Sequence, residues 1–100
     1  MEYKFELGRK RIVAIDENGT EAGKCLFTIH EGYWSIDHTY VNPDYRGRNI
    51  AENLVDGIVT EARKAGVKIL PVCSYAVMQF QRKAEYQDIR YTDAVEKPAE

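Results

Sequence analysis

Apolar and polar residues alternate through most of the first half of the chain, a pattern typical of β-strands that bury one face. The alternation predicts short strands over Lys4–Gly8 and Arg11–Asp16, then longer strands over Glu21–Glu31 and Tyr33–Val41. Short connections separate these strands, so each strand is expected to pair with the next. The first part of the chain therefore predicts an antiparallel meander.

Local sequence also predicts how the meander turns and which side chains share a face. Asn18-Gly19 favours a type I′ turn, in which both central residues have positive φ, and Gly32 closes a second hairpin. In the last strand, strict alternation defines two faces. One face carries Trp34, Ile36, His38 and Tyr40, and the other carries Tyr33, Ser35, Asp37, Thr39 and Val41.

After residue 49 the periodicity becomes that of an amphipathic helix. Gly66 ends this helix, and the apolar run Val67–Val72 predicts a strand that is buried on both faces and parallel to the strand before the helix. Ser74 is the expected N-cap of a second helix over Tyr75–Ala84, and Tyr86–Tyr91 adds a turn or a short edge strand. The apolar stripe of the first helix consists of Ile50, Ala51, Leu54, Val55, Ile58, Val59, Ala62 and Ala65.

These elements predict one α/β (α+β) domain: an antiparallel meander followed by strand–helix–strand–helix, with one parallel pair of strands. The 100 residues, 44% of them hydrophobic, suffice for a single core. We expect the domain to span residues 1–95, and residues 96–100 to form a frayed C-terminal tail.

Composition narrows the range of partners. A net charge of -2 provides no global positive field, which argues against nucleic acid as the main partner. No apolar run reaches the roughly 20 residues that cross a bilayer, and the polar, acidic start does not look like a secretory signal, so we expect a cytoplasmic protein with no membrane partner. Cys25 and Cys73 lack the spacing of metal ligands, so we expect two free thiols and no metal site.

The segment Val41–Ala51 leads from the last strand of the meander into the first helix and has the composition of an anion site. The first turn of a helix leaves backbone N–H groups without partners, and the peptide dipoles make that end partly positive. Gly47 lets the main chain approach a ligand closely, while Arg46 and Arg48 add positive charge. This segment therefore predicts a site for a phosphate group.

Within this segment, Tyr45-Arg46-Gly47-Arg48-Asn49-Ile50-Ala51, preceded by Val41 and Pro43, resembles the acetyl-CoA motif R/Q-x-x-G-x-G/A of the GCN5-related N-acetyltransferase (GNAT) superfamily. The resemblance implies a minimal GNAT fold with acetyl-CoA (coenzyme A) as co-substrate. It implies that the backbone of the loop holds the pyrophosphate and that the strand edge ending at Val41 pairs with the pantetheine arm. The implied cofactor-binding residues are Val41, Arg46, Gly47, Arg48, Asn49, Ile50 and Ala51.

Two flanking motifs narrow the resemblance. His38-Thr39-x-Val41 and Pro71-x-Cys73-Ser74-Tyr75-Ala76 are similar to a group of very small, single-domain members, the YjdJ-type proteins. The likeness extends over most of the chain from Trp34 to Ile89. Asn49 departs from the motif, because it stands where the final Gly is expected and brings a side chain to the phosphate. The alternative is that Gly47 and Asn49 only shape a sharp turn.

Acetyl transfer needs a nucleophile, an oxyanion donor and an acid for the departing thiolate. Cys73 lies where the buried strand meets the second helix, whose dipole favours a thiolate, and the small GNAT group implies catalysis at this position. A covalent acetyl-cysteine follows from that interpretation. The alternative is a small buried hydrophobic residue.

Two further side chains are candidates for acid–base chemistry. His38 lies on the strand that leads to the loop, and an unperturbed pKa of about 6.5 suits a general base. Tyr75 resembles the tyrosine that protonates the CoA thiolate in many GNAT enzymes, although it lies earlier in its helix. The alternatives are a histidine packed against aromatic rings and a tyrosine at the edge of the core. His30 has no motif around it and is expected at the surface.

Two functions from different classes follow. The first is an acetyl-CoA-dependent N-acetyltransferase that moves an acetyl group to an unidentified amine on a small molecule or a protein, with Cys73 and His38 as the catalytic pair. The second is a non-catalytic coenzyme A-binding or interaction module on the same fold, which Asn49 favours. A purely structural domain requires all three motif matches to be accidental.

Overall fold

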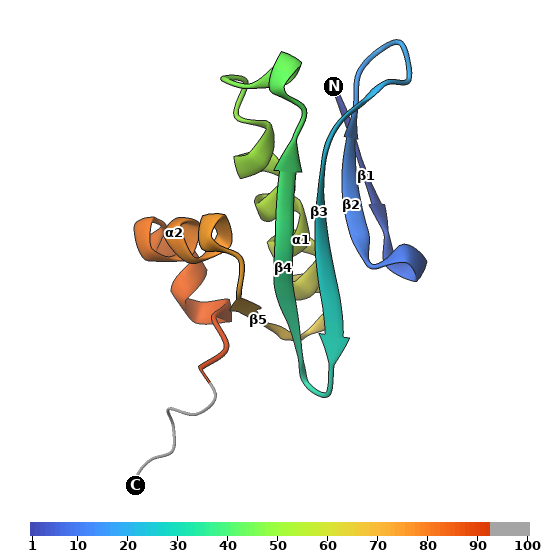
Figure 1. The fold of residues 1–100 in the computed structure, drawn as a ribbon. Coiled ribbons are helices and arrows are strands. Elements are labelled where there is room, and N and C mark those ends of the chain that lie inside the picture. The colour runs from blue at the N-terminus through green and yellow to red at the C-terminus, as the bar shows by residue number, and fades with distance from the viewer. Residues whose placement is uncertain (93–100) are drawn as a thin grey trace, which may run out of the picture.

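The structure is a computed structural model and describes residues 1–92. Its centre is a five-stranded sheet with the order β1-β2-β3-β4-β5, in which only β4 and β5 are parallel (Figure 1). This architecture confirms the predicted fold class. The elements are β1 (Glu2–Glu6), η1 (Leu7–Arg9), β2 (Arg11–Ile15), β3 (Glu21–His30), β4 (Tyr33–Val41), η2 (Pro43–Tyr45), α1 (Ile50–Ala65), β5 (Lys68–Pro71), α2 (Ser74–Arg82) and η3 (Ala84–Ile89), where η marks a 3₁₀ helix.

The predicted domain end at residue 95 and the predicted tail, residues 96–100, lie outside the described residues. Within residues 1–92, no helix combines the length and the apolar character needed to cross a membrane.

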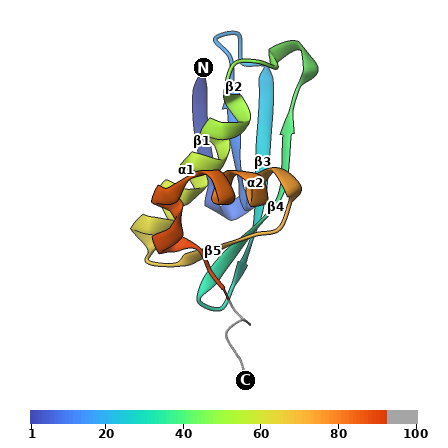
Figure 2. The ribbon, with the colours of Figure 1, turned by 90° about the vertical axis from the view of Figure 1, so that its left-hand side faces the viewer.

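α1 packs across one face of the sheet (Figure 2). Its buried residues all belong to the predicted apolar stripe: Ile50, Leu54, Val55, Ile58, Val59 and Ala62. Two glycines allow this close approach. A Cβ at Gly57 would lie 2.4 Å from Cδ1 of Ile12, and a Cβ at Gly23 would lie 2.7 Å from the carbonyl oxygen of Tyr40 and 3.3 Å from Cγ2 of Ile50. The first turn of α1 is therefore seated directly on β3, which fixes the start of the helix relative to the sheet.

α2 and η3 lie at the β4–β5 side of the sheet and contact α1 through a few specific pairs (Figure 1). The rings of Phe80 and Tyr86 lie 4.9 Å apart, and the Tyr86 hydroxyl donates a 2.9 Å hydrogen bond to Asp56 on α1. Lys83 forms a 2.7 Å ion pair with Glu52, also on α1. These contacts fix the position of α2 and η3 relative to α1.

A β-bulge in β4 makes the predicted faces of this strand wrong. Phe27 pairs with Ile36 but Leu26 pairs with His38, so Asp37 is an extra residue in the ladder. The bulge shifts the alternation by one residue. Trp34 and Ile36 therefore share the α1 side of the sheet with Thr39 and Val41, whereas His38 and Tyr40 are exposed on the opposite side.

The turn between β2 and β3 is not the predicted type I′ turn. Gly19 has φ +84°, but Asn18 is not among the residues with positive φ. The Asp16 side chain explains the difference, because its carboxylate accepts hydrogen bonds from the backbone N–H groups of Asn18 and Thr20 and so organises a longer turn.

Element boundaries also differ from the prediction. β1 begins at Glu2, β5 is confined to Lys68–Pro71, and α2 ends at Arg82. The segment predicted as a turn or edge strand forms η3, followed by a single parallel bridge between Ile69 and Arg90.

Candidate functional site

The site begins where β4 and β5 separate. Their pairing ends at Ile36 and Pro71, and the carbonyl oxygen of Ile36 accepts from the N–H groups of both Val72 and Cys73 at 3.0 Å. From there the chain leaves the sheet into α2, while β4 continues to Val41 without β5 beside it. An open strand edge therefore lies between the starts of α1 and α2.

The loop from β4 to α1 is held in shape by its own backbone. Asn42 accepts hydrogen bonds from the N–H of Asp44 through its side chain and from the N–H of Tyr45 through its carbonyl. Gly47 then takes φ +84° and Asn49 takes φ 60°. Two left-handed residues so close together turn the chain sharply into the helix.

This turn leaves backbone N–H groups exposed and without hydrogen-bond acceptors. Among the described residues, the N–H groups of Gly47, Arg48 and Asn49 have no hydrogen-bond partner, and they precede the unpaired amides of the first turn of α1. A Cβ at Gly47 would meet nothing within 4 Å, so the loop borders open space. A run of free N–H groups at a helix N-terminus fits the phosphates of coenzyme A.

Asn49 is the N-cap of α1, and its side chain makes no capping hydrogen bond. Its carbonyl accepts the first helical bond, from the N–H of Asn53 at 3.0 Å. Asn tolerates the left-handed conformation better than most residues with a side chain. Asn49 thus takes the backbone conformation that a Gly adopts readily, and its amide is left without an internal partner in residues 1–92.

Tyr45 anchors the loop to the distant β2–β3 turn. Its hydroxyl donates a hydrogen bond to the Asp16 carboxylate. This bond raises the pKa of Tyr45 and, together with the amide of Thr20, lowers the pKa of Asp16. The guanidinium of Arg48 lies 5.4 Å from the centre of the Tyr45 ring, a cation–π contact that directs it toward this anchor.

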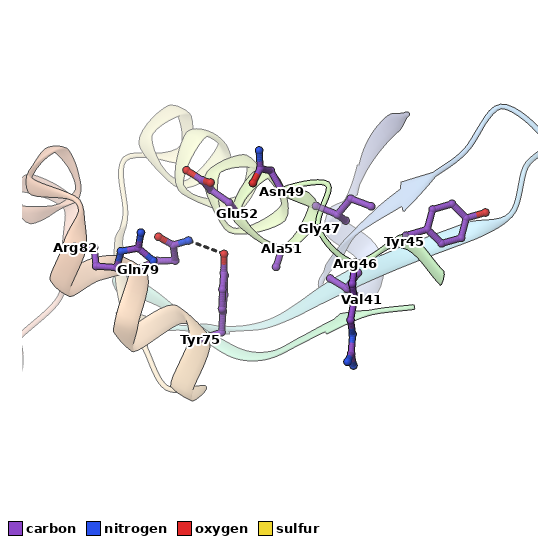
Figure 3. Close-up of a pocket in the computed structure, with 11 residues that line it drawn as sticks. Val41, Tyr45, Arg46, Gly47, Asn49, Ala51, Glu52, Tyr75, Gln79 and Arg82 are labelled. Carbon is purple, nitrogen blue, oxygen red and sulfur yellow. Dashed lines mark hydrogen bonds between the residues drawn. The ribbon is translucent and has the colours of Figure 1, made fainter. Parts of the chain in front are cut away.

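A pocket of about 450 Å³ joins the loop to α2 (Figure 3). Six of the seven predicted cofactor-binding residues line it; the seventh, Arg48, does not. Figure 3 shows Tyr75 and Gln79 of α2 facing Ala51 across the pocket, with Arg82 further along the same helix. The lining residues are Val41, Tyr45, Arg46, Gly47, Asn49, Ile50, Ala51, Glu52, Tyr75, Gln79 and Arg82.

Gln79 and Arg82 are pocket residues that the sequence interpretation missed. Gln79 is nearly buried, and its side-chain amide donates a 2.5 Å hydrogen bond to the Tyr75 hydroxyl. Residues at spacing i, i+4 and i+7 share one helix face, so the position of Tyr75 could have indicated both. Since the Tyr75 hydroxyl accepts this bond, its own proton is available to a group in the pocket.

Cys73, and not the predicted Ser74, is the N-cap of α2. Its sulfur accepts a hydrogen bond from the Ala76 N–H at 3.4 Å, and it lies 3.4 Å from the hydroxyl oxygen of Thr39 on β4. The side chain is half-buried and is not among the residues that line the pocket. Donors at a helix N-terminus stabilise negative charge on the sulfur, as a nucleophilic cysteine requires.

The structure does not bring His38 to Cys73. Thr39 reaches Cys73 from one side of β4, and His38, its neighbour in the strand, points to the other side and is exposed. Within residues 1–92, the His38 side chain makes no hydrogen bond or ion pair. A catalytic role for His38 stays a prediction, without the direct pairing that we expected.

His30 is exposed as predicted, yet it has defined contacts. Its Nε2 lies 2.8 Å from the hydroxyl of Ser35, which donates to Asp37, and its ring stacks on Tyr33 at 4.6 Å. Among residues 1–92, no three His, Cys, Asp or Glu side chains are grouped so that they could hold a metal ion.

Comparison with protein families decides the assignment. Residues 11–89 match the family model described as GCN5-related N-acetyl-transferase. The chain belongs to the GCN5-related N-acetyltransferase family. As a GNAT member it is an acyltransferase, and the acetyl-CoA motif predicted at Val41–Ala51 falls within the matched region. The narrower likeness to the YjdJ-type group stays a prediction.

Several solved structures share the fold of this chain. A GCN5-like protein from Staphylococcus aureus superposes with a TM-score of 0.70 at 23% identity, covering 97% of this chain and 96% of that one. An acetyltransferase from Bacillus cereus matches with a TM-score of 0.61 at 23% identity over 72% of this chain and 53% of its own. N-acetylglutamate synthase from Neisseria gonorrhoeae, solved with coenzyme A and N-acetyl-glutamate, matches with a TM-score of 0.62 at 16% identity over 73% and 18%.

At these identities the likeness shows the GNAT fold alone. The chain spans nearly all of the Staphylococcus aureus protein but only about half, or less, of the other two. No protein with a curated description matches the sequence.

Proposed function

We propose that this GNAT protein transfers the acetyl group of acetyl-CoA to an amine, and that the group passes through Cys73. The observation that carries the proposal is the pocket that runs from the unpaired N–H groups at the start of α1 to Tyr75 on α2, beside the open edge of β4. The acceptor amine is unidentified, on a small molecule or a protein. A cytoplasmic location and the absence of nucleic-acid and membrane partners stay predictions.

The loop before α1 and the first turn of that helix account for the binding of coenzyme A. The N–H groups of residues 47–51 donate to the pyrophosphate, and Arg46 adds positive charge at the pocket. The edge of β4 from Asp37 to Val41 offers backbone groups to the amides of the pantetheine arm, as an added strand would. Acetyl-CoA supplies the activated acetyl thioester.

Cys73 provides the nucleophile in this proposal. Its thiolate attacks the thioester carbonyl, a new S–C bond forms, and the bond to the CoA sulfur breaks. Tyr75 donates its hydroxyl proton to the departing sulfur, and the proton is later restored from solvent. The unprotonated acceptor amine then attacks the acetyl-cysteine, which releases Cys73 as a thiolate and gives the amide after loss of a proton.

His38 has a different place in this scheme than the sequence indicated. Because its side chain is exposed on the face opposite Thr39, we assign it no contact with Cys73. It remains a candidate base for an acceptor that approaches from that face, through water or directly.

Mass spectrometry with acetyl-CoA tests the proposal. We expect an increase of one acetyl group on the Cys73 peptide, which disappears when a suitable amine is added. Cys73→Ala should abolish the adduct while acetyl-CoA still raises the melting temperature. Ser74→Ala, at the exposed neighbouring position, is the matched control and should retain the adduct.

The alternative is a coenzyme A-binding module without turnover. A melting temperature raised by acetyl-CoA, with neither an adduct nor release of CoA across a panel of amines, would establish that function instead. No shift in the melting temperature at high acetyl-CoA concentration would reject both.

A further inference from the structure

Cys25, Thr39 and Cys73 form a continuous line of hydrogen-bonding groups. The Thr39 hydroxyl oxygen lies 3.4 Å from the sulfur of Cys73 and 3.4 Å from the sulfur of Cys25. Cys25 is the cross-strand partner of Thr39 in the β3–β4 ladder and is fully buried. The bulge at Asp37 is what turns Thr39 toward these two sulfurs.

The protonation of the two cysteines gives this line a direction. A threonine hydroxyl has one hydrogen to donate and two lone pairs that accept. A Cys73 thiolate only accepts, so Thr39 must give its hydrogen to Cys73 in that state. Burial raises the pKa of the Cys25 thiol to about 12, so Cys25 keeps its hydrogen at neutral pH and donates it to Thr39.

We propose that Thr39 is a positioning residue for Cys73, and that buried Cys25 orients the Thr39 hydroxyl so that its hydrogen points at the Cys73 sulfur. This inference rests on the proposed function, in which the Cys73 thiolate accepts the acetyl group. It adds a role for Cys25 on β3 and Thr39 on β4, neither of which lines the pocket.

The arrangement fixes the Cys73 sulfur from two directions. The Ala76 N–H holds it from α2, and the Thr39 hydroxyl holds it from the sheet. Together the two donors stabilise the thiolate and restrict the side chain to one orientation. Cys25, with its side chain fully buried, serves only as a donor in this line.

The rate of alkylation of Cys73 by iodoacetamide, followed against pH by peptide mass spectrometry without acetyl-CoA, tests the inference. Thr39→Val removes one hydrogen bond to the charged sulfur. The midpoint of the curve of alkylation rate against pH should therefore move upward by about one pH unit, which corresponds to about tenfold slower alkylation at neutral pH. Valine has nearly the same shape as threonine and suits a strand, so folding should be retained.

Two further variants separate positioning from a structural role. Thr39→Ser keeps the hydroxyl and should restore the wild-type midpoint. Cys25→Ala removes the orienting donor and should raise the midpoint by a smaller amount. A wild-type midpoint in Thr39→Val, or equal midpoints in Thr39→Ser and Thr39→Val, would overturn the role of Thr39; a wild-type midpoint in Cys25→Ala would overturn that of Cys25.

This readout is independent of acetyl transfer. A midpoint that depends on Thr39 in a protein that never forms an acetyl adduct supports the positioning of Cys73 and overturns the proposed function. An acetyl adduct in the wild-type protein, together with a pH midpoint that is unchanged by substitution of Thr39, supports the proposed function and overturns the positioning role of Thr39.

Discussion

Tyr45, in the 3₁₀ turn before α1, donates a hydrogen bond to Asp16, which lies in the turn between β2 and β3. The Asp16 carboxylate also accepts the N–H groups of Asn18 and Thr20. One carboxylate therefore organises its own turn and anchors the loop that carries the unpaired amides. The shape of the loop that carries the unpaired amides therefore depends on Asp16, which is far from it in sequence.

Replacing Tyr45 with Phe should weaken coenzyme A binding about threefold to tenfold, since one hydrogen bond that holds the loop is worth about 1 kcal/mol. The ring, and with it the contact to Arg48, is retained. Calorimetric titration with coenzyme A measures the effect. Tyr3→Phe, which removes a hydroxyl bonded to Asn53 outside the pocket, is the control and should bind like wild type. Equal affinity in Tyr45→Phe would show that the loop keeps its shape without the anchor.

The same anchor predicts a dependence on acid. Asp16 has a pKa lowered chiefly by the Tyr45 hydroxyl, so its contribution to stability is present above its ordinary pKa and is lost as the pH falls through the lowered value. In Tyr45→Phe the pKa of Asp16 should rise toward the ordinary value of an aspartate, because the largest cause of its lowering is removed. Carboxyl-resolved NMR titration of both proteins measures this directly. Identical Asp16 titration curves in the two proteins would contradict the anchor.

Patterns that repeat along the chain predicted most of the fold. Most of the stripe predicted from Ile50 to Ala65 is buried, but Ala51 is half-buried at the pocket and Ala65 is exposed. Gly66 ends the helix in the left-handed conformation, as predicted. The bulge at Asp37 was not predictable, because an extra residue in a ladder leaves the local alternation of residue types intact. This single residue reversed the faces of Thr39 and His38.

The site was predicted only as far as contiguous motifs reach. The loop from Arg46 to Ala51 could be recognised because its residues are adjacent in sequence. The bonds from Tyr45 to Asp16 and from Thr39 to Cys25 join segments that only the fold brings together. No spacing in the sequence marks such pairs.

Asn49 offers a test of backbone conformation against side-chain chemistry. With φ 60°, an alanine at this position should lower the free energy of unfolding by about 1 kcal/mol and weaken coenzyme A binding, whereas a glycine should leave both nearly unchanged. Chemical denaturation and calorimetric titration measure the two quantities. Asn18→Ala, at an exposed position without positive φ, is the control. A tenfold loss of affinity in Asn49→Gly would show instead that the side-chain amide itself holds the ligand.

Arg82 should contribute positive charge at the α2 end of the pocket. It lines the pocket and forms no ion pair within residues 1–92, so its charge is available to a phosphate group. Arg82→Ala should weaken coenzyme A binding about fivefold at low salt, and the difference should shrink as salt screens the charge. Arg9→Ala makes the same change in net charge outside the pocket, in η1, and should have little effect. If Arg9→Ala lost as much affinity as Arg82→Ala, the effect would come from the net charge of the protein and not from the position of Arg82 in the pocket.

Tyr75 should act on the departing thiolate rather than on binding. Its hydroxyl accepts from Gln79 at 2.5 Å, which leaves its own proton directed elsewhere. A thiolate is a good leaving group, so loss of the acid should slow acetylation of Cys73 by about a hundredfold, the low end for general acid catalysis. Single-turnover mass spectrometry of Tyr75→Phe measures the rate, and titration should give an unchanged affinity for coenzyme A. Tyr33→Phe is the control, because its ring stacks on His30 away from the pocket. A weaker affinity with an unchanged rate would make Tyr75 a binding residue.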